Sequence, residues 1–245
     1  EPADDEMKKT IDNLRTDFYQ TMTDLYQENC LDIIREWLHT KNMKLRAEVS
    51  YCKTLEISQP VKSVDYVEGE SLEFFNNIDL YRGLSGAAHI FDKRYSSETG
   101  AMFGANYLYD SDYYRQIFYM QYASGIQKTV THGYSAEYGP EGAVAWPGYE
   151  GMFSGFSERF NKRQPSAIDS EAVNEHLSRI QKVLEQGVPQ MDIGMLRSDY
   201  NYNAGYAMIE QDTYQNKAHN QEGYYWNDME LQNNGYTYEY FSPYL

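Results

Sequence analysis

Acidic and imidazole side chains stand close to the points where strand-like runs of the sequence give way to loops. Glu48, Glu98 and His132 each occupy such a position. Carboxyl and imidazole groups can exchange protons and can bond the hydroxyl groups of sugars. In a closed βα barrel, catalytic groups lie where the strands end and the following loops begin. These three side chains are therefore candidates for one shared site, provided that the fold brings their strands together.

The elements that must position these side chains are strands separated by helices or loops. Residues 44–51 alternate between apolar and polar side chains, as expected of a strand with one buried face. Strand-like composition is found in four segments, namely residues 44–51, 94–98, 127–134 and 190–197. Since strands that alternate with helices form parallel sheets, these segments predict repeated βα units.

Apolar residues spaced by three and four positions predict the helices. The first is expected over residues 5–27, with one apolar face made by Met7, Ile11, Leu14, Phe18, Met22 and Leu25. Further helices are expected over residues 31–39, 71–91, 112–124 and 170–186, and around residues 204–212. Asp110 or Ser111 can cap the helix that ends at Gly125, and Asp169 can cap the helix over 170–186.

The predicted fold class is α/β, a partial (β/α)8 TIM-type barrel of about four βα units. Residues 1–245 are interpreted as a single domain, and residues 200–245 as a polar end segment rich in Tyr and Asn. Four strands cannot close an eight-stranded barrel, and an open half would expose two sheet edges. We therefore expect missing strands upstream of the chain, a partner chain, or a dimer that covers the open sheet.

Composition narrows the class of ligand. The formal net charge is −16, which argues against nucleic acid and anionic membranes because contacts with phosphate need Lys and Arg. No apolar run approaches the roughly 18 to 20 residues that span a bilayer. Tyrosine occurs 25 times, and its flat face and hydroxyl suit sugar rings, although many tyrosines simply pack at loop bases. The composition favours a neutral partner such as carbohydrate.

The sequence lacks the short motifs that are typical of several other enzyme classes. It contains no G-x-S-x-G, G-x-G-x-x-G, G-K-[ST] or H-E-x-x-H pattern, which argues against serine hydrolases, dinucleotide and nucleotide sites, and zinc proteases. Cys30 and Cys52 form no metal-binding pattern and no disulfide framework. Cysteine and zinc chemistry are therefore not expected.

Several stretches, in a fixed order, carry a resemblance to a known family. They are DLYQENCLDIIREWLHTKNMKLRAEVSY (24–51), YVEGES (66–71), GLSGAAHIFDKRYSSET (83–99), GIQKTVTHGYS (125–135), WPGYEG (146–151) and HLSRIQKVLEQGVPQMDIGML (176–196). In this series the chain resembles the catalytic domain of glycoside hydrolase family 106, the α-L-rhamnosidases, over nearly its whole length. Single pieces such as WPG are weak signals, and the ordered series is the specific one.

The resemblance implies the C-terminal half of a catalytic barrel that hydrolyses terminal α-L-rhamnosyl residues of polysaccharide. It further implies inversion at the anomeric carbon, calcium at the sugar site in some members, and an extracellular or periplasmic location. Inversion needs a carboxylic acid and a carboxylate about 6.5 to 9.5 Å apart, with water between the carboxylate and the sugar. The resemblance implies that the general acid lies before this chain, so no acid is assigned here.

The resemblance also gives roles to individual residues. It implies an active-site acidic residue at Glu98, which we expect to be the general base, with Glu68 and Glu70 as the next catalytic candidates. Either of these two could instead bind calcium or a sugar hydroxyl. For substrate binding we expect four residues, namely Glu48, His132, Tyr134 and Trp146. Glu48 takes a place where relatives more often carry an amide, which leaves its role open.

Structural roles remain open for the same side chains. Glu98 could pair with Arg94 or Arg115, and His132 could bond a backbone carbonyl. Asp65, Glu68 and Glu70 could belong to a solvated acidic loop between residues 52 and 70. The alternative function is a non-catalytic carbohydrate-binding or scaffold domain derived from a glycosidase barrel, and a self-assembling structural domain is a third possibility.

Overall fold

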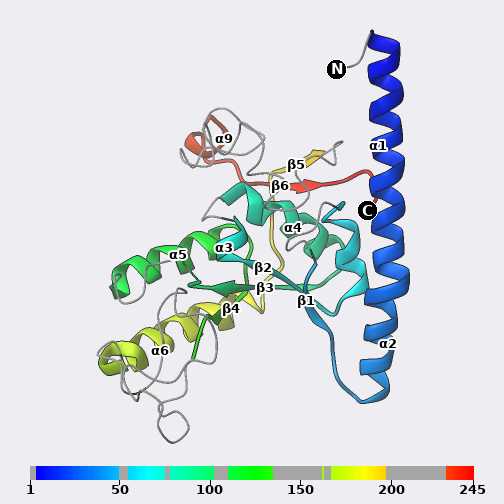
Figure 1. The fold of residues 1–245 in the computed structure, drawn as a ribbon. Coiled ribbons are helices and arrows are strands. Elements are labelled where there is room, and N and C mark those ends of the chain that lie inside the picture. The colour runs from blue at the N-terminus through cyan, green and yellow to red at the C-terminus, as the bar shows by residue number, and fades with distance from the viewer. Residues whose placement is uncertain are drawn as a thin grey trace, which may run out of the picture.

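The structure is a computed structural model built around a parallel sheet (Figure 1). It describes residues 4–49, 55–74, 78–101, 110–134, 162, 167–196 and 230–245. The sheet has the strand order β1-β2-β3-β4, and every neighbouring pair is parallel. Its strands are β1 (Arg46–Glu48), β2 (Tyr66–Glu70), β3 (Arg94–Thr99) and β4 (Lys128–Thr131). Parallel strands in sequential order, connected through helices, confirm the predicted α/β class and the partial barrel.

The helices follow the sequence pattern closely. They are α1 (Asp5–Tyr26), α2 (Asp32–Thr40), α3 (Ser71–Phe74), α4 (Ile78–Ile90), α5 (Ser111–Ala123), α6 (Ala167–Leu184) and α9 (Glu230–Asn233). A π-helical turn, η1 (Gln27–Leu31), joins α1 to α2. The predicted helix over 71–91 contains α3 and α4, while residues 75–77 between them and the predicted helix around 204–212 lie outside the described residues.

Helix ends agree with the predicted caps in one case and differ in the other. The Asp110 carboxylate accepts a hydrogen bond from the Tyr113 N–H at 3.0 Å, which caps α5 as predicted. Gly125 follows α5 with φ of 105°, a conformation that favours glycine. The predicted cap at Asp169 is wrong, because α6 begins at Ala167 and Asp169 lies in its first turn.

The strand predictions need two corrections. Residues 66–70 form β2, not a loop, and β2 lies at the centre of the sheet beside β1 and β3. The segment predicted over 190–197 does form a strand, β5 (Ile193–Leu196), but it pairs with β6 (Tyr238–Phe241) in a separate two-stranded sheet. Within the described residues, the barrel portion has four strands because β2 takes the place that the sequence interpretation gave to β5.

The main hydrophobic core lies between the sheet and the helices on one of its faces. Tyr81 and Leu84 of α4 and Tyr95 of β3 are fully buried in this core, and the Tyr95 hydroxyl donates to the Tyr81 carbonyl at 3.0 Å. The turn η2 (Gln59–Ser63), which connects β1 to β2, contributes Val61 to the same core. Burial of these large side chains holds the sheet against α4.

The C-terminal strand β6 packs on the side of α4 that faces away from the four-stranded sheet (Figure 1). Gly86 of α4 allows this approach, since a Cβ atom there would lie 2.0 Å from the Tyr240 carbonyl oxygen. The hydroxyls of Tyr238 and Tyr240 donate to the buried Asp79 carboxylate at 2.5 and 2.8 Å. These contacts fix residues 238–241 as an ordered strand within the segment expected to be a polar end.

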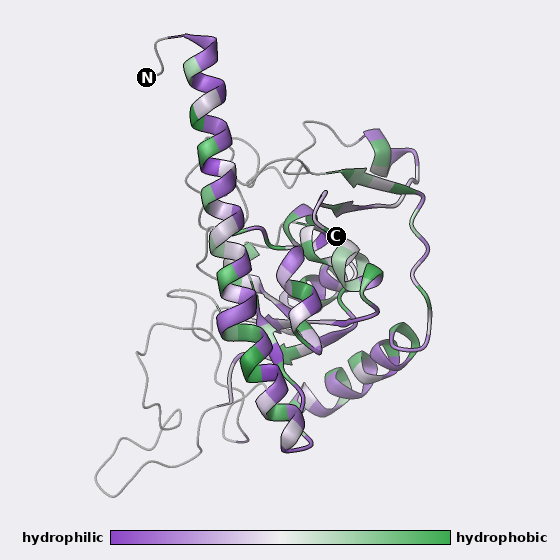
Figure 2. Cartoon of the chain, turned by 90° about the vertical axis from the view of Figure 1, so that its right-hand side faces the viewer, coloured by the Kyte–Doolittle hydropathy of each residue, from purple (hydrophilic) through white to green (hydrophobic). Residues whose placement is uncertain are grey.

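The apolar face predicted for α1 is exposed. Leu14 and Phe18 remain 63% and 60% exposed, and Figure 2 shows apolar and polar residues along the whole length of this helix. The body of the fold instead contacts polar residues of α1: Gln20 and Asp24 both bond Gln59, at 2.8 and 2.9 Å. Within the described residues, no helix is both long and apolar enough to cross a membrane.

Candidate functional site

The strand register brings four glutamates to one face of the sheet. Glu48 of β1 lies opposite Glu68 of β2, and Glu70 of β2 lies opposite Glu98 of β3. Side chains alternate between the faces of a strand, so residues two apart share a face. All four glutamates therefore project from the same face, near the ends of three adjacent strands.

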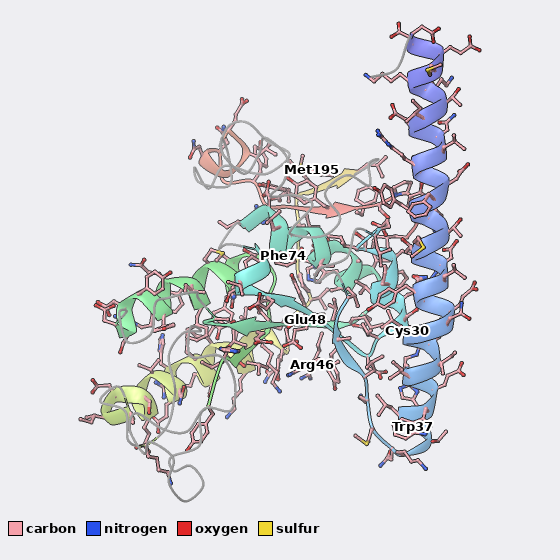
Figure 3. The ribbon with its side chains drawn as sticks, in the orientation of Figure 1. Cys30, Trp37, Arg46, Glu48, Phe74 and Met195 are labelled. Carbon is pink, nitrogen blue, oxygen red and sulfur yellow. The ribbon has the colours of Figure 1, made fainter. Side chains whose placement is uncertain are left out.

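This glutamate face is the one turned away from the core helices. A Cβ atom at Gly69 would contact Phe74 of α3 and Tyr95, and Thr99 bonds Gln121 of α5, so the odd-numbered residues of β2 and β3 face the helices. Figure 3 shows Glu48 on the other side of the sheet from Phe74. In a barrel, this face is the interior, where the ligand-binding side chains of the strand ends converge.

Glu68 is the buried centre of the glutamate face. Its residue is 5% exposed, and its carboxylate accepts a hydrogen bond from the Arg46 Nε at 2.8 Å. Burial raises the pKa of Glu68 against the opposing effect of Arg46, and the nearby Glu98 raises it further. The second oxygen, Oε1, is buried with no hydrogen-bond partner among the described residues. The hydrogen-bonding capacity of this oxygen is thus not met by the described residues.

Glu48 and Glu98 are joined directly by a side-chain hydrogen bond across β2. Burial, the charge of Glu98 and this bond raise the pKa of Glu48 to about 9, with smaller contributions from Glu68 and Glu70. Glu48 is therefore protonated at neutral pH and is the donor in this bond. Two carboxyl groups in direct contact can hold one proton between them more easily than two negative charges.

Glu98 presents a partly exposed carboxyl group on this face. Its side chain is 34% exposed, and the Nε2 of His132 lies 3.9 Å from its Oε1. The alternative ion pairs do not form, since Arg94 pairs with Glu185 at 3.2 Å and Arg115 pairs with Asp112. Glu98 and His132 therefore meet at the edge of the glutamate face, as the sequence interpretation required of a shared site.

A buried amide on the helix-covered face of the sheet holds the end of β3 that carries Glu98. Gln121 of α5 is fully buried, donates to the Ser97 hydroxyl at 3.1 Å and accepts from the Thr99 hydroxyl at 2.9 Å. These two residues flank Glu98 in β3, so the end of the strand is tied to α5 on both sides of the candidate base. The sequence interpretation did not identify Gln121, although its place on the sheet-facing side of a capped helix was a usable signal.

The other expected site residues are less well placed. Tyr134 follows β4 and is 66% exposed, and Trp146 lies outside the described residues. Glu70 is buried at 3% exposure on the same face as Glu98. The solvated-loop interpretation of Glu68 and Glu70 is wrong, because β2 carries both into the sheet. Arg46, which the sequence interpretation missed, could have been found by its two-residue spacing from Glu48.

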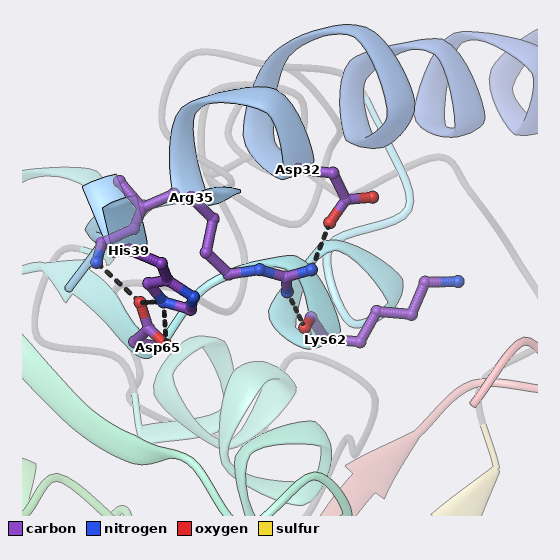
Figure 4. A network of polar contacts seen from close by, with 6 residues as sticks. Asp32, Arg35, His39, Lys62 and Asp65 are labelled. Carbon is purple, nitrogen blue, oxygen red and sulfur yellow. Dashed lines mark hydrogen bonds and ion pairs between the residues drawn. The ribbon is translucent and has the colours of Figure 1, made fainter. Parts of the chain in front are cut away.

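Asp65 belongs to a structural network and not to the glutamate face (Figure 4). Its carboxylate accepts from the Leu45 N–H at 2.7 Å and bonds the His39 ring at 2.9 Å. Partial burial raises its pKa, but the Leu45 and His39 contacts outweigh that effect and lower it overall. Arg35 of α2 donates to the Lys62 carbonyl at 2.7 Å. These bonds join α2 to the start of β2.

The described residues contain no group of three or more His, Cys, Asp or Glu side chains arranged to hold a metal ion. The four glutamates share a face, yet Glu68 is committed to Arg46 and Glu48 is protonated. A calcium ion prefers six to eight oxygen ligands with several negative charges. No such ligand set is found among the described residues, and calcium binding stays a prediction.

The comparisons with known proteins support the fold. The chain is similar to the solved structure of a rhamnosidase from Novosphingobium sp. PP1Y, with a TM-score of 0.65 and 13% sequence identity. The match covers 94% of this chain and 21% of that chain, so this chain spans about a fifth of the length of the rhamnosidase. No family model and no curated protein matches. The likeness shows a glycosidase-like fold and does not assign the chain to family 106.

Proposed function

We propose that this chain is the C-terminal half of the catalytic barrel of an inverting glycosidase that acts on terminal α-L-rhamnosyl residues, with Glu98 as the general base. The observation that carries the proposal is the position of Glu98, an accessible carboxylate at the end of β3 beside His132. The fold shared with a rhamnosidase over 94% of the chain supports the same assignment.

The chemistry of inversion selects Glu98 among the four glutamates. A general base must be ionised and must reach the attacking water. Glu48 is protonated at neutral pH, and Glu68 and Glu70 are buried. Glu98 takes a proton from water, and that water attacks the anomeric carbon on the side opposite the leaving oxygen.

The remaining polar groups on this face suit a sugar. The His132 ring, whose side chain is 33% exposed, can bond a sugar hydroxyl. We propose the same binding role for Glu70, Tyr134 and Trp146. An extracellular or periplasmic location follows only from the proposed polysaccharide substrate.

We propose that the general acid of this mechanism lies outside this chain, and among the described residues Glu48 is not placed to supply it. Glu48 and Glu98 are hydrogen-bonded, so they are far closer than the about 6.5 to 9.5 Å between the two carboxyl groups of an inverting enzyme. We propose that upstream strands, a partner chain or a second copy complete the barrel beside β1 or β4, the edge strands of the described sheet, and supply the acid.

The experiment is hydrolysis of an aryl α-L-rhamnoside with a very good leaving group, by this chain and by its Glu98→Gln variant. Such a leaving group needs little protonation, so the assay tests the base without the acid. Loss of a general base lowers the rate by roughly 10² to 10⁴-fold. Glu185→Gln is the matched control, because Glu185 pairs with Arg94 at the start of β3, away from the site.

The outcomes separate the proposals. Normal turnover by a folded Glu98→Gln variant removes Glu98 as the base, and an α-configured product would contradict inversion. Parallel assays with calcium and with a chelator test the calcium prediction, which the described ligands do not favour.

A second candidate is a non-catalytic carbohydrate-binding domain, which the direct Glu48–Glu98 bond favours because it leaves no acid and base at catalytic spacing between these two residues. It predicts rhamnose binding by calorimetry from a folded chain without turnover. Binding that is lost in the His132→Ala variant would support this candidate only if hydrolysis is absent in the wild type.

A further inference from the structure

Glu48 has a position that neither a base nor an acid of this reaction would occupy. It projects from β1 on the same face as Glu98, two strands away, and reaches over β2 to bond the Glu98 carboxylate. Its neighbours on this face are also acidic, since Glu68 lies opposite it in the register. A second negative charge here would be repelled by at least two carboxylates.

We infer that Glu48 acts as a neutral hydrogen-bond donor that positions the Glu98 carboxylate. This inference rests on the proposed function in one respect only, the identity of Glu98 as the base. A protonated carboxyl carries one O–H donor and keeps an acceptor oxygen, as the amide of glutamine carries N–H donors and one acceptor oxygen. It is a positioning residue, since it acts through Glu98.

The charged groups around this pair explain which carboxyl keeps the proton. The pKa of Glu48 is raised most by burial, and next by the acidic side chains of β3 and β2. Arg46, the cation on the same strand, is bonded to Glu68 and not to Glu48. On the far side, His132 lies 3.9 Å from Glu98. The cation of β1 is thus bonded to Glu68, while Glu48 has acidic neighbours, and the proton stays on Glu48.

The bond also has a geometric consequence for the base. A carboxylate that accepts a hydrogen bond on one oxygen is held in one rotamer, and its other oxygen is left for water. His132 approaches the Oε1 of Glu98. Glu48 of β1 thus contacts Glu98 from one side. His132, which follows β4, lies near Glu98 on the other side.

The first test measures protonation directly and does not need activity. The chain is labelled with ¹³C at the glutamate side-chain carboxyls, and the Glu48 signal is assigned as the one missing from the spectrum of the Glu48→Gln variant. We expect this signal to keep the chemical shift of a neutral carboxyl at pH 7 and to titrate only well above it. A Glu48 signal that titrates near the ordinary value of about 4.3 would overturn the inference.

The second test uses rhamnoside hydrolysis and compares Glu48→Ala with Glu48→Gln. Loss of a hydrogen bond to a charged group predicts a fall in kcat of about ten- to a hundredfold for Glu48→Ala. Glu48→Gln keeps a donor and should lose less than about threefold. The acidic limb of the pH–rate profile should move to higher pH in Glu48→Ala alone, because only this variant leaves the base without its donor.

Each outcome has one meaning. Equal loss in both variants would show that Glu48 needs its own carboxyl for proton transfer and would overturn the positioning role. An acidic limb that moves to lower pH in both variants would show that Glu48 is ionised in the wild type. If the Glu98→Gln variant hydrolyses normally while the Glu48 carboxyl stays protonated at pH 7, the proposed base fails and the neutral Glu48 stands.

Discussion

Replacement of Gln121 by methionine tests how the fold holds the candidate base. Gln121 is fully buried, and its amide joins α5 to both residues that flank Glu98: it donates to the Ser97 hydroxyl at 3.1 Å and accepts from Thr99 at 2.9 Å. It also donates to the Tyr81 hydroxyl of α4 at 3.0 Å. Methionine has a similar length and no hydrogen-bonding group of comparable strength.

The expected loss follows from these three bonds. A buried neutral hydrogen bond contributes roughly 1 kcal/mol net, so their removal lowers the free energy of unfolding by about 3 kcal/mol. The Ser97 hydroxyl also donates to the Glu98 carbonyl at 3.0 Å, and Thr99 reaches the Ser97 carbonyl at 3.3 Å. These local bonds remain in the variant, which keeps the cost from rising further.

Urea unfolding followed by circular dichroism measures this loss. Gln127→Met is the matched control, since Gln127 makes two longer bonds, accepting from the Tyr95 N–H at 3.4 Å and donating to the Leu184 carbonyl at 3.3 Å. We expect the control to lose less than about 1 kcal/mol. A Gln121→Met variant that is no less stable than Gln127→Met would refute the view that this amide secures the end of β3.

Two further predictions concern packing and pH. Gly86→Ala should lower the free energy of unfolding by about 3 kcal/mol, because its Cβ would lie 2.0 Å from the backbone oxygen of Tyr240. Gly187→Ala is the control, since a Cβ there meets open space, and it should cost far less in the same urea titration. Equal costs for the two variants would contradict the packing of β6 on α4. The pKa of Asp65 is lowered in the folded chain because the Leu45 N–H bond and its histidine contact outweigh partial burial. This group therefore stabilises the fold above its unfolded pKa, and the contribution is lost as pH falls through the lowered folded value. The stability difference between wild type and Asp65→Asn should shrink as the pH falls below about 4, and a difference that grows in acid would show the opposite sign of linkage.

Local patterns predicted the elements whose signals do not depend on distant residues. The alternation within residues 44–51 placed β1, and Asp110 with Gly125 placed both ends of α5, because capping and backbone conformation act over a few residues. β2 was missed because its sequence, YVEGE, contains two glutamates and a glycine, which are uncommon in strands. Only its neighbours in the sheet make that segment a strand.

Pairing between distant segments could not be predicted from local patterns. Residues 193–196 have the composition of a strand, but their partner is β6, about 45 residues later, and β6 is fixed by contacts of Tyr238 and Tyr240 with Asp79. The apolar face of α1 shows the converse. Its spacing correctly predicts a helix, while the exposure of Leu14 and Phe18 depends on which side of that helix meets the body of the fold.

The candidate site also has some features that local sequence patterns predict and others that depend on distant segments. Glu48 and Glu98 were placed near strand ends by the sequence, because position along a strand is a local property. Their bond to each other is not local, since it requires β2 between them, and the sequence interpretation had assigned β2 to a loop. Burial and the contact with Glu98 keep a proton on Glu48, and Glu68 and Glu70 of β2 add smaller contributions. The protonation state of Glu48 therefore depends on the order of the strands in the sheet. Local sequence patterns did not predict that order, because they did not identify β2 as a strand.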